Sequence, residues 1–382
     1  MTPLSKQKCV MIIAGEASGD LHGSRLVTAM RNKNKALFFC GIGGQALKAS
    51  GVRVLVDASE LSVVGITEAF SKLPNLLKGM AVAKKMLKRL LPDLLILIDF
   101  PDFNLNVAAC AKKLGIPVLY YISPQIWAWR PGRVKKIGKL VDHMAVILPF
   151  EEDFYRKHQI PVTFVGHPLL DTNFDYEKKA FQKPKNDISV IGLCPGSRDR
   201  EIARHLPVML GAAQILYKKM KNIKFMVSLA PDVKRKTVED IVNKHKGGAD
   251  LDIVSGPVRK IFNLSSVVIA ASGTVTLESA ISGTPMVIIY KVSPISYWLG
   301  RALIQVNHIG LVNLITGKKI VPELLQGQAS PIRIADTVFN MLSDASGLEK
   351  LRLELLKVKD VLGGPGASER VADIAIGMLH KA

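Results

Sequence analysis

A polar turn in the middle of the chain, Pro195-Gly196-Ser197-Arg198, follows an apolar run at 188–194 and precedes a helical pattern. A helix N-terminus offers unpaired N–H groups and a partial positive charge, and glycine lets a ligand approach closely. Arginine adds a two-pronged donor that fits phosphate. The stretch therefore predicts a site for the diphosphate of a nucleotide, although an ordinary capped helix with a surface arginine would use the same residues.

A second turn repeats this pattern further along. Ser272-Gly273-Thr274 follows the apolar run 267–271, and Glu278 lies one helical turn later. Two helix N-termini in one domain can converge on one diphosphate. Glu278 would then be placed to accept hydrogen bonds from ribose hydroxyls.

Asp99 follows the apolar run 94–98 and precedes Pro101, at which a helix is predicted to begin. Neighbouring apolar groups raise the pKa of a carboxyl group and make it a better proton acceptor near neutral pH. We predict that Asp99 is a general base. A metal site shared with Asp102 is the weaker alternative, because no histidine or third acid stands close by in sequence.

Two glycine turns follow the first two strand-like runs. Glu16 would repel a phosphate and suits sugar hydroxyls, although a simple turn with an exposed acid fits equally; Ser18 could cap the next helix. The stretch 41–46 matches the loose G-x-G-x-x-A dinucleotide pattern, but without a clear ribose-binding acid.

Tryptophan, arginine and lysine gather at 123–139, where Trp127, Trp129 and Arg130 follow another strand-like run. They could form a wall for a phosphorylated, lipid-bearing acceptor or an interface belt, or simply pack in a core beneath a basic surface. His167 follows the next strand-like run, and its role is open.

The segment 61–91 interleaves apolar side chains with lysine and arginine and contains one acid, Glu68. Its predicted membrane or acyl-chain contacts are Val63, Val64, Ile66, Phe70, Leu73, Leu76 and Leu77. Such a composition is typical of a helix that lies in a membrane interface with its cations at anionic headgroups. A core-facing helix with a solvated basic face is the alternative.

Composition narrows the partners. The chain has 382 residues, a formal net charge of +20 and 6% aromatic residues, which favours an anionic partner. We find no RNA-binding, zinc-finger or basic-zipper signature, so nucleic acid is not expected. The four cysteines are scattered, as in a reducing cytosol. No apolar run is long enough to span a membrane, and the short run at 10–14 is a first strand rather than a signal peptide.

Strand-like runs alternate with helix-length segments, which predicts parallel sheets covered on both faces. The runs are 9–14, 36–40, 94–98, 118–122, 145–148, 162–165, 188–194, 224–229, 251–254, 267–271 and 286–290. A polar, lysine-rich stretch at 171–187 separates the two series and is the expected linker. The predicted fold is α/β, with two Rossmann-like doubly wound domains at 1–170 and 188–345 that face a cleft, and C-terminal helices at 346–382 that could pack back on the first domain.

Eight motifs in order resemble those of the lipid-A-disaccharide synthase family, bacterial inverting glycosyltransferases with two Rossmann domains (GT-B type). They are AGEASGD at 14–20, IDFPDFN at 98–104, SPQIWAWR at 123–130, PFE at 149–151, GHP at 166–168, PGSR at 195–198, ASGTVTLE at 271–278 and VPELLQ at 321–326. Gln45, Val312 and Lys318 depart from the family pattern.

The resemblance implies transfer of 2,3-diacylglucosamine from UDP to the 6-hydroxyl of 2,3-diacylglucosamine 1-phosphate, giving a β-1,6 disaccharide and UDP. Asp99 would be the base of a single inverting displacement. The UDP-binding residues would be Gly196, Ser197, Arg198, Ser272, Gly273, Thr274 and Glu278, and the sugar and acceptor residues would be Glu16, Ser18, Asn313, Trp129 and Arg130.

The resemblance also implies no metal or other cofactor, and a peripheral place on the cytoplasmic face of the inner membrane of a Gram-negative cell. The first domain would bind the acceptor and lipid, and the second the UDP-sugar. The resemblance does not fix the oligomeric state, and a homodimer is one of the states that it leaves open. Two alternatives remain at this point: a related transferase with a soluble or peptidoglycan-type acceptor, and a non-catalytic or NAD-binding protein that uses 41–46.

Overall fold

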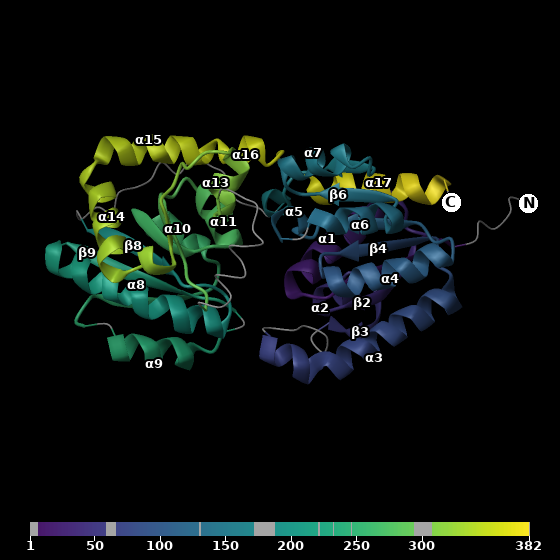
Figure 1. The fold of residues 1–382 in the computed structure, drawn as a ribbon, viewed down its shortest axis with the longest axis horizontal. Coiled ribbons are helices and arrows are strands. Elements are labelled where there is room, and N and C mark those ends of the chain that lie inside the picture. Colours follow the sequence, from purple (N-terminus) through teal and green to yellow (C-terminus); the bar gives the residue numbers. More distant parts are fainter. Residues whose placement is uncertain are drawn as a thin grey trace, which may run out of the picture. The chain divides into compact units, whose positions relative to one another are not determined.

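The computed structural model describes residues 7–58, 66–129, 131–171, 188–220, 222–231, 233–245, 247–293 and 308–381, with backbone alone at 66–73, 129 and 131. The chain forms two compact units (Figure 1). Unit 1 comprises Met1–Phe174 and Leu362–Ala382, and unit 2 comprises Asp175–Val361. The chain therefore returns to unit 1 at its C-terminal end.

Unit 1 is built on a parallel sheet with strand order β3-β2-β1-β4-β5-β6-β7. Its strands are β1 (Cys9–Ala14), β2 (Phe38–Gly43), β3 (Arg53–Asp57), β4 (Leu94–Ile98), β5 (Val118–Tyr121), β6 (His143–Val146) and β7 (Val162–Phe164). Each of the six predicted runs overlaps a strand. The edge strand β3 was not predicted, because it is half-exposed and begins and ends on charged residues rather than forming an apolar run.

Helices cover both faces of this sheet, which explains why β4 is buried along its whole length. One face packs against α3 (Ile66–Leu90), α4 (Pro101–Lys113), α6 (Val134–Leu140) and α7 (Pro149–Lys157). The other packs against α1 (Ala17–Lys33), α2 (Gln45–Ala49) and α17 (Ala367–Lys381). The short α5 (Ile126–Trp129) follows β5.

Asp171 fixes the start of α17. Its carboxylate accepts hydrogen bonds from the backbone N–H groups of Gly366, Ala367 and Ser368 at 2.7–2.9 Å. Ser368 Oγ donates a further bond at 2.8 Å. A carboxylate at a helix N-terminus satisfies orphan donors and complements the helix dipole, so this contact secures the last helix in unit 1.

Unit 2 repeats the plan with strand order β10-β9-β8-β11-β12-β13. Its strands are β8 (Ser189–Cys194), β9 (Ile223–Leu229), β10 (Leu251–Ser255), β11 (Val267–Ala271), β12 (Met286–Tyr290) and β13 (Glu323–Leu325). Its helices are α8 (Asp199–Lys219), α9 (Arg235–His245), α10 (Arg259–Leu264), α11 (Thr274–Ile281), α13 (Leu311–Thr316), α14 (Pro331–Ser343), α15 (Ala345–Leu356) and α16 (Val358–Val361). Of the helices beyond residue 346, α16 stays with unit 2 and α17 belongs to unit 1.

The predicted fold class of two doubly wound α/β domains is confirmed. In each sheet the strand order reverses beside the first strand: β1 lies between β2 and β4, and β8 lies between β9 and β11. Ligands of such sheets bind at this reversal, beyond the carboxyl ends of the strands. The turns after β1, β4, β8 and β11 therefore lie where sheets of this kind bind ligands. Within the residues described, no helix is both long and apolar enough to cross a membrane.

Candidate functional site

The turns after β1 and β4 lie together in unit 1. Ala14 pairs with Ile98 in the parallel register, so Gly15 and Asp99 leave neighbouring strands at the same level. A Cβ on Gly15 would lie 2.2 Å from Cδ1 of Phe100, so only glycine lets that ring pack against the first turn. This close approach brings Glu16 next to the Asp99 turn.

The backbone at Asp99 is held in an unfavourable conformation. Asp99 and Phe100 have φ values of 47° and 48°, in the left-handed region that L-residues rarely adopt. Tyr120 Oη donates to the Asp99 carbonyl at 2.6 Å, and Asn104 Nδ2 donates to the same oxygen at 2.7 Å. Strain that the surrounding structure maintains in this way clusters at functional sites.

The Asp99 carboxyl group has the electrostatics of a general base. Burial raises its pKa, the neighbouring Glu16 carboxylate raises it further, and together they bring it to about 6. Such a group is still ionised near neutral pH and is more basic than an ordinary aspartate. Asp102 faces a different partner, since it forms an ion pair with Arg133 at 2.7 Å.

The remaining residues predicted for the sugar and acceptor site of unit 1 are only partly described. Ser18 is exposed in the first turn of α1, and the hypothesis that it caps this helix is wrong because the N-cap residue is Glu16. Trp129 ends α5, but its side chain lies outside the described part, as does all of Arg130.

Trp127 is held inside unit 1. Its Nε1 donates to Glu151 Oε1 at 2.9 Å, and its ring meets Phe150 edge-on. Burial raises the pKa of Glu151 to about 7, although hydrogen bonds from Trp127 and from backbone groups offset part of this rise. The α5 turn is thereby tied to the start of α7.

The stretch 41–46 does not offer a phosphate site. The buried Asp20 carboxylate accepts hydrogen bonds from the N–H groups of Gly44, Ala46 and Leu47 at 2.6–3.2 Å. A Cβ on Gly41 would lie 1.8 Å from the Ile12 carbonyl oxygen, so strand pairing requires this glycine. The donors that a diphosphate would use are taken by Asp20, which the sequence reading had not assigned.

Of the predicted membrane-contact residues, Val63 and Val64 lie outside the described residues. Ile66, Phe70 and Leu73 lie on α3, with side chains that are not described. The Leu76 side chain is partly buried against the core, whereas 61% of Leu77 is exposed.

In unit 2, the turns after β8 and β11 are neighbours, because Cys194 pairs with Ala270. Arg198 is the N-cap residue of α8 and Gly273 that of α11, and neither helix start receives a hydrogen bond from its cap side chain. Two helix N-termini thus begin beside each other at the strand-order reversal, an arrangement suited to an anion.

The carboxylate of Glu201 occupies the first of these helix starts. Ser197 N donates to Glu201 Oε2 at 3.0 Å, and Arg198 Nη1 lies 3.6 Å from Glu201 Oε1. A Cβ on Gly196 would lie 2.4 Å from Glu201 Oε2. The turn therefore already binds a negatively charged group. The sequence reading missed this role, although an acid in the first turn of a helix was the available signal.

No described residue covers the second helix start at Gly273. Among the residues that the structure describes, a Cβ on Gly273 would meet no atom within 4 Å, so their packing does not require glycine there. Ser272 Oγ donates to the Ile309 carbonyl at 3.1 Å, and Thr274 is exposed. Burial raises the pKa of Glu278 to about 7. Near neutral pH its carboxyl group can both donate and accept hydrogen bonds, as recognition of hydroxyl groups requires.

His205 supports the Pro195–Arg198 turn from within α8. Lys291 N donates to its Nε2 at 3.1 Å, so Nδ1 carries the proton and donates to the Pro195 carbonyl at 3.0 Å. Burial lowers the pKa of His205, which keeps the ring neutral. Nothing in the sequence distinguishes this histidine from any other on an amphipathic helix.

Asn313 is fully buried and its amide is saturated within unit 2. It donates to the Val321 carbonyl at 2.9 Å and to Glu323 Oε1 at 2.8 Å, and it accepts bonds from Ile320 N and Val321 N. A direct contact with a sugar would break these bonds. In this structure Asn313 organises the segment between α13 and β13.

Comparison with known proteins places these features in a family. The family model for lipid-A-disaccharide synthetase matches residues 10–369. The chain is 46% identical over 378 residues to a lipid-A-disaccharide synthase of Syntrophus aciditrophicus, covering 98% of each chain. It is 47% identical over 380 residues to that of Geobacter metallireducens, again covering 98% of each.

Solved structures share the fold at low sequence identity. A solved structure from Listeria monocytogenes, described as a UDP-N-acetylglucosamine 2-epimerase, aligns with a TM-score of 0.66 at 11% identity, covering 99% of this chain and 98% of that one. Acinetobacter baumannii MurG aligns with a TM-score of 0.60 at 15% identity, covering 98% of this chain and all of that one (100%).

Proposed function

Because the chain belongs to the lipid-A-disaccharide synthetase family, it is a glycosyltransferase that forms the lipid A disaccharide, and we propose that Asp99 is its base. The donor is UDP-2,3-diacylglucosamine and the acceptor is 2,3-diacylglucosamine 1-phosphate. The observation that carries this proposal is the Asp99 turn, which combines a maintained strained backbone with a pKa raised to about 6.

The proposed reaction is a single displacement. Asp99 accepts the proton of the acceptor 6-hydroxyl as that oxygen attacks the anomeric carbon, and the bond from this carbon to the UDP oxygen breaks. Attack from the face opposite UDP inverts the anomeric configuration, so the product is β-linked and no covalent sugar–enzyme intermediate forms. Glu16 would contact the sugar as well as raise the pKa of Asp99.

The negative charge that develops on UDP is met by Arg198 and by the N-termini of α8 and α11. Positioned donors of this kind stabilise a leaving group without a metal ion. Glu278 would bind the ribose hydroxyls. For Asn313 we propose an indirect role, in which it holds the segment before β13 in place.

The test is incubation with both diacylated substrates and measurement of UDP release and disaccharide formation. Asp99→Asn should lower turnover by about 10²–10⁴-fold while UDP binding measured by calorimetry stays intact. Asp102→Asn is the matched control, because this carboxylate already pairs with Arg133 and should be dispensable. Near-normal turnover of Asp99→Asn would require a different base, and an α-linked product would exclude single displacement.

We further propose that α3 contacts the cytoplasmic face of the inner membrane through its N-terminal part. The 61% exposure of Leu77 supports this. Serine at Phe70, Leu73 and Leu77 should move the protein to the soluble fraction with unchanged circular dichroism, and Leu76 is left in place because its side chain packs partly against the core. Leu353→Ser, at a comparably exposed leucine of unit 2 (55%), should not. Unchanged fractionation of the first variant would contradict the assignment.

A further inference from the structure

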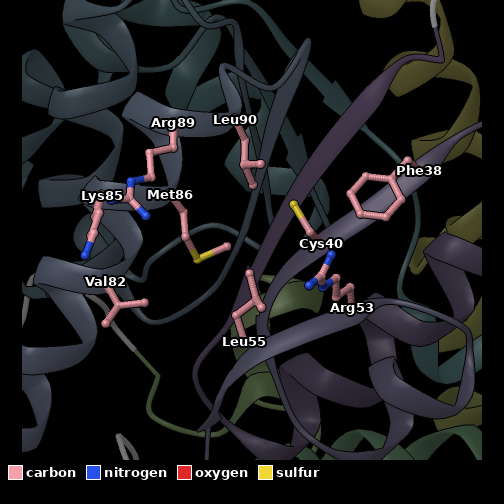
Figure 2. A pocket seen from close by; sticks show the side chains of 9 residues that line it. All are labelled: Phe38, Cys40, Arg53, Leu55, Val82, Lys85, Met86, Arg89 and Leu90. Carbon is pink, nitrogen blue, oxygen red and sulfur yellow. The ribbon is translucent and has the colours of Figure 1, made fainter.

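Unit 1 contains a pocket of about 240 Å³ between α3 and the edge of the sheet (Figure 2). Side chains of the second half of α3 line one side, and side chains of β2 and β3 line the other. The lining residues are Phe38, Cys40, Arg53, Leu55, Val82, Lys85, Met86, Arg89 and Leu90. No residue described above as part of the catalytic or UDP site contributes to it.

The pocket lies away from the Asp99 turn. Phe38 and Arg53 are the first residues of β2 and β3, so the pocket lies toward the amino ends of these strands. Asp99 follows the carboxyl end of β4, which runs parallel to them. The two sites are therefore at opposite ends of the same sheet.

The chemistry of the lining is amphiphilic. Its interior is apolar, and Leu55 and Leu90 each leave 43% of their surface exposed, which water disfavours. Arg53, Lys85 and Arg89 are also exposed, and no carboxylate in the described part of the chain forms an ion pair with any of them. The acid that follows α3, Asp93, is engaged by Lys8 at 3.3 Å and by Cys9 N at 2.7 Å.

We propose that this pocket binds a single-chain anionic lipid, a fatty acid being the simplest member, with the acyl chain against Leu55, Val82 and Met86 and the anionic head among Arg53, Lys85 and Arg89. The volume supports one chain rather than a larger ligand, since pockets for drug-sized molecules measure about 300–1,000 Å³. The head group gains three cations that pair with no carboxylate in the described part of the chain, and the acyl chain covers the exposed leucines. The bound lipid contacts side chains of both α3 and the edge strand β3.

The experiment uses the full chain and titration calorimetry with decanoate below its micellar concentration. Decanol supplies the same chain without the charge, and acetate supplies the charge without the chain. Decanoate should bind at least about tenfold more tightly than either. A methyl-labelled Met86 signal in NMR spectra, assigned with Met86→Leu, should shift on titration and place the ligand in the pocket.

Charge variants distinguish binding of decanoate in this pocket from its unspecific attraction to a basic protein. Arg53→Gln with Arg89→Gln should weaken decanoate binding by about tenfold or more, while Lys48→Gln with Lys88→Gln, two exposed lysines outside the lining, should leave it unchanged. Val82→Trp should fill the pocket and block binding. If it does not fold, Leu55→Gln at the exposed rim should weaken the chain contact instead.

Three results would overturn the proposal. Equal weakening by the two charge pairs would show unspecific attraction, and equal binding of decanol would remove the role of the cations. An unmoved Met86 signal would place the lipid elsewhere. Failure of these tests leaves the transferase assay with Asp99→Asn unaffected, because the two sites share no residue.

Discussion

Ser197 N donates a hydrogen bond to Glu201 Oε2 at 3.0 Å, and the same carboxylate lies 3.6 Å from the Arg198 guanidinium. The donors proposed for the UDP diphosphate are thus bound by a carboxylate of the protein itself. A diphosphate can use them only if Glu201 gives them up.

Glu201→Gln should therefore bind UDP more tightly, by about three- to tenfold, because the amide competes less strongly than a carboxylate for Ser197 N and Arg198. Calorimetry with UDP measures this. Glu239→Gln makes the same charge change on α9, where the carboxylate pairs with Arg235 at 2.8 Å, and should leave affinity unchanged. Weaker UDP binding by Glu201→Gln would mean that Glu201 orients Arg198 for the ligand instead.

The pH dependence of turnover should report Asp99. A base acts in its deprotonated form, so activity should rise with pH through a midpoint near 6, the value to which burial and Glu16 raise the pKa of Asp99. Glu16→Gln removes a neighbouring negative charge, so the Asp99 pKa should fall and the acidic limb should move to lower pH. The pH profile of kcat/KM measures this shift. An acidic limb at the same pH in both proteins would show that the Glu16 charge does not affect the pKa of Asp99.

Tyr120→Phe removes the hydroxyl that donates to the Asp99 carbonyl at 2.6 Å and retains the buried ring. The carbonyl keeps Asn104 as a donor, so the protein should fold. Turnover should fall by about tenfold because the Asp99 carboxyl group is held less precisely, whereas UDP affinity should stay unchanged. A lower melting temperature with full turnover would show that Tyr120 serves stability alone.

Asp171→Asn tests how strongly Asp171 holds the start of α17 in unit 1. Loss of the charge and of part of its hydrogen bonding to Gly366, Ala367 and Ser368 should destabilise unit 1 by about 1–2 kcal/mol. Burial raises the pKa of Asp171, but the hydrogen bonds from Ser368, Ala367 and Gly366 together lower it by more, so its folded-state pKa lies below the unfolded value. Its stabilisation is present above the unfolded pKa and is lost as pH falls through the folded pKa.

Thermal unfolding of Asp171→Asn and the parent chain should consequently differ near neutral pH and converge in acid. Hydrogen exchange should show faster opening of α17 in the variant. Asp344→Asn is a matched control, because this carboxylate caps α15 in unit 2 and should leave α17 protection unchanged.

The sequence by itself determined the local elements and the chemistry that their turns carry. Apolar runs predicted eleven strands, and the residue types at Asp99, Arg198 and Ser272 indicated a base and an anion site, because strand periodicity and helix-start chemistry are set by a few adjacent residues. The edge strands β3 and β13 escaped this reading, and with β3 the pocket against α3.

The tertiary structure alone decided which turns meet and what each side chain faces. Strand order places β1 beside β4 and β8 beside β11, which brings Glu16 to Asp99 and Ser197 near Gly273 across long stretches of chain. Packing also committed the Asp20 carboxylate to the N–H groups at the start of α2, 24–27 residues further along the chain. Burial and long-range pairing set these outcomes, and both depend on residues far apart in sequence that only the folded chain brings into contact.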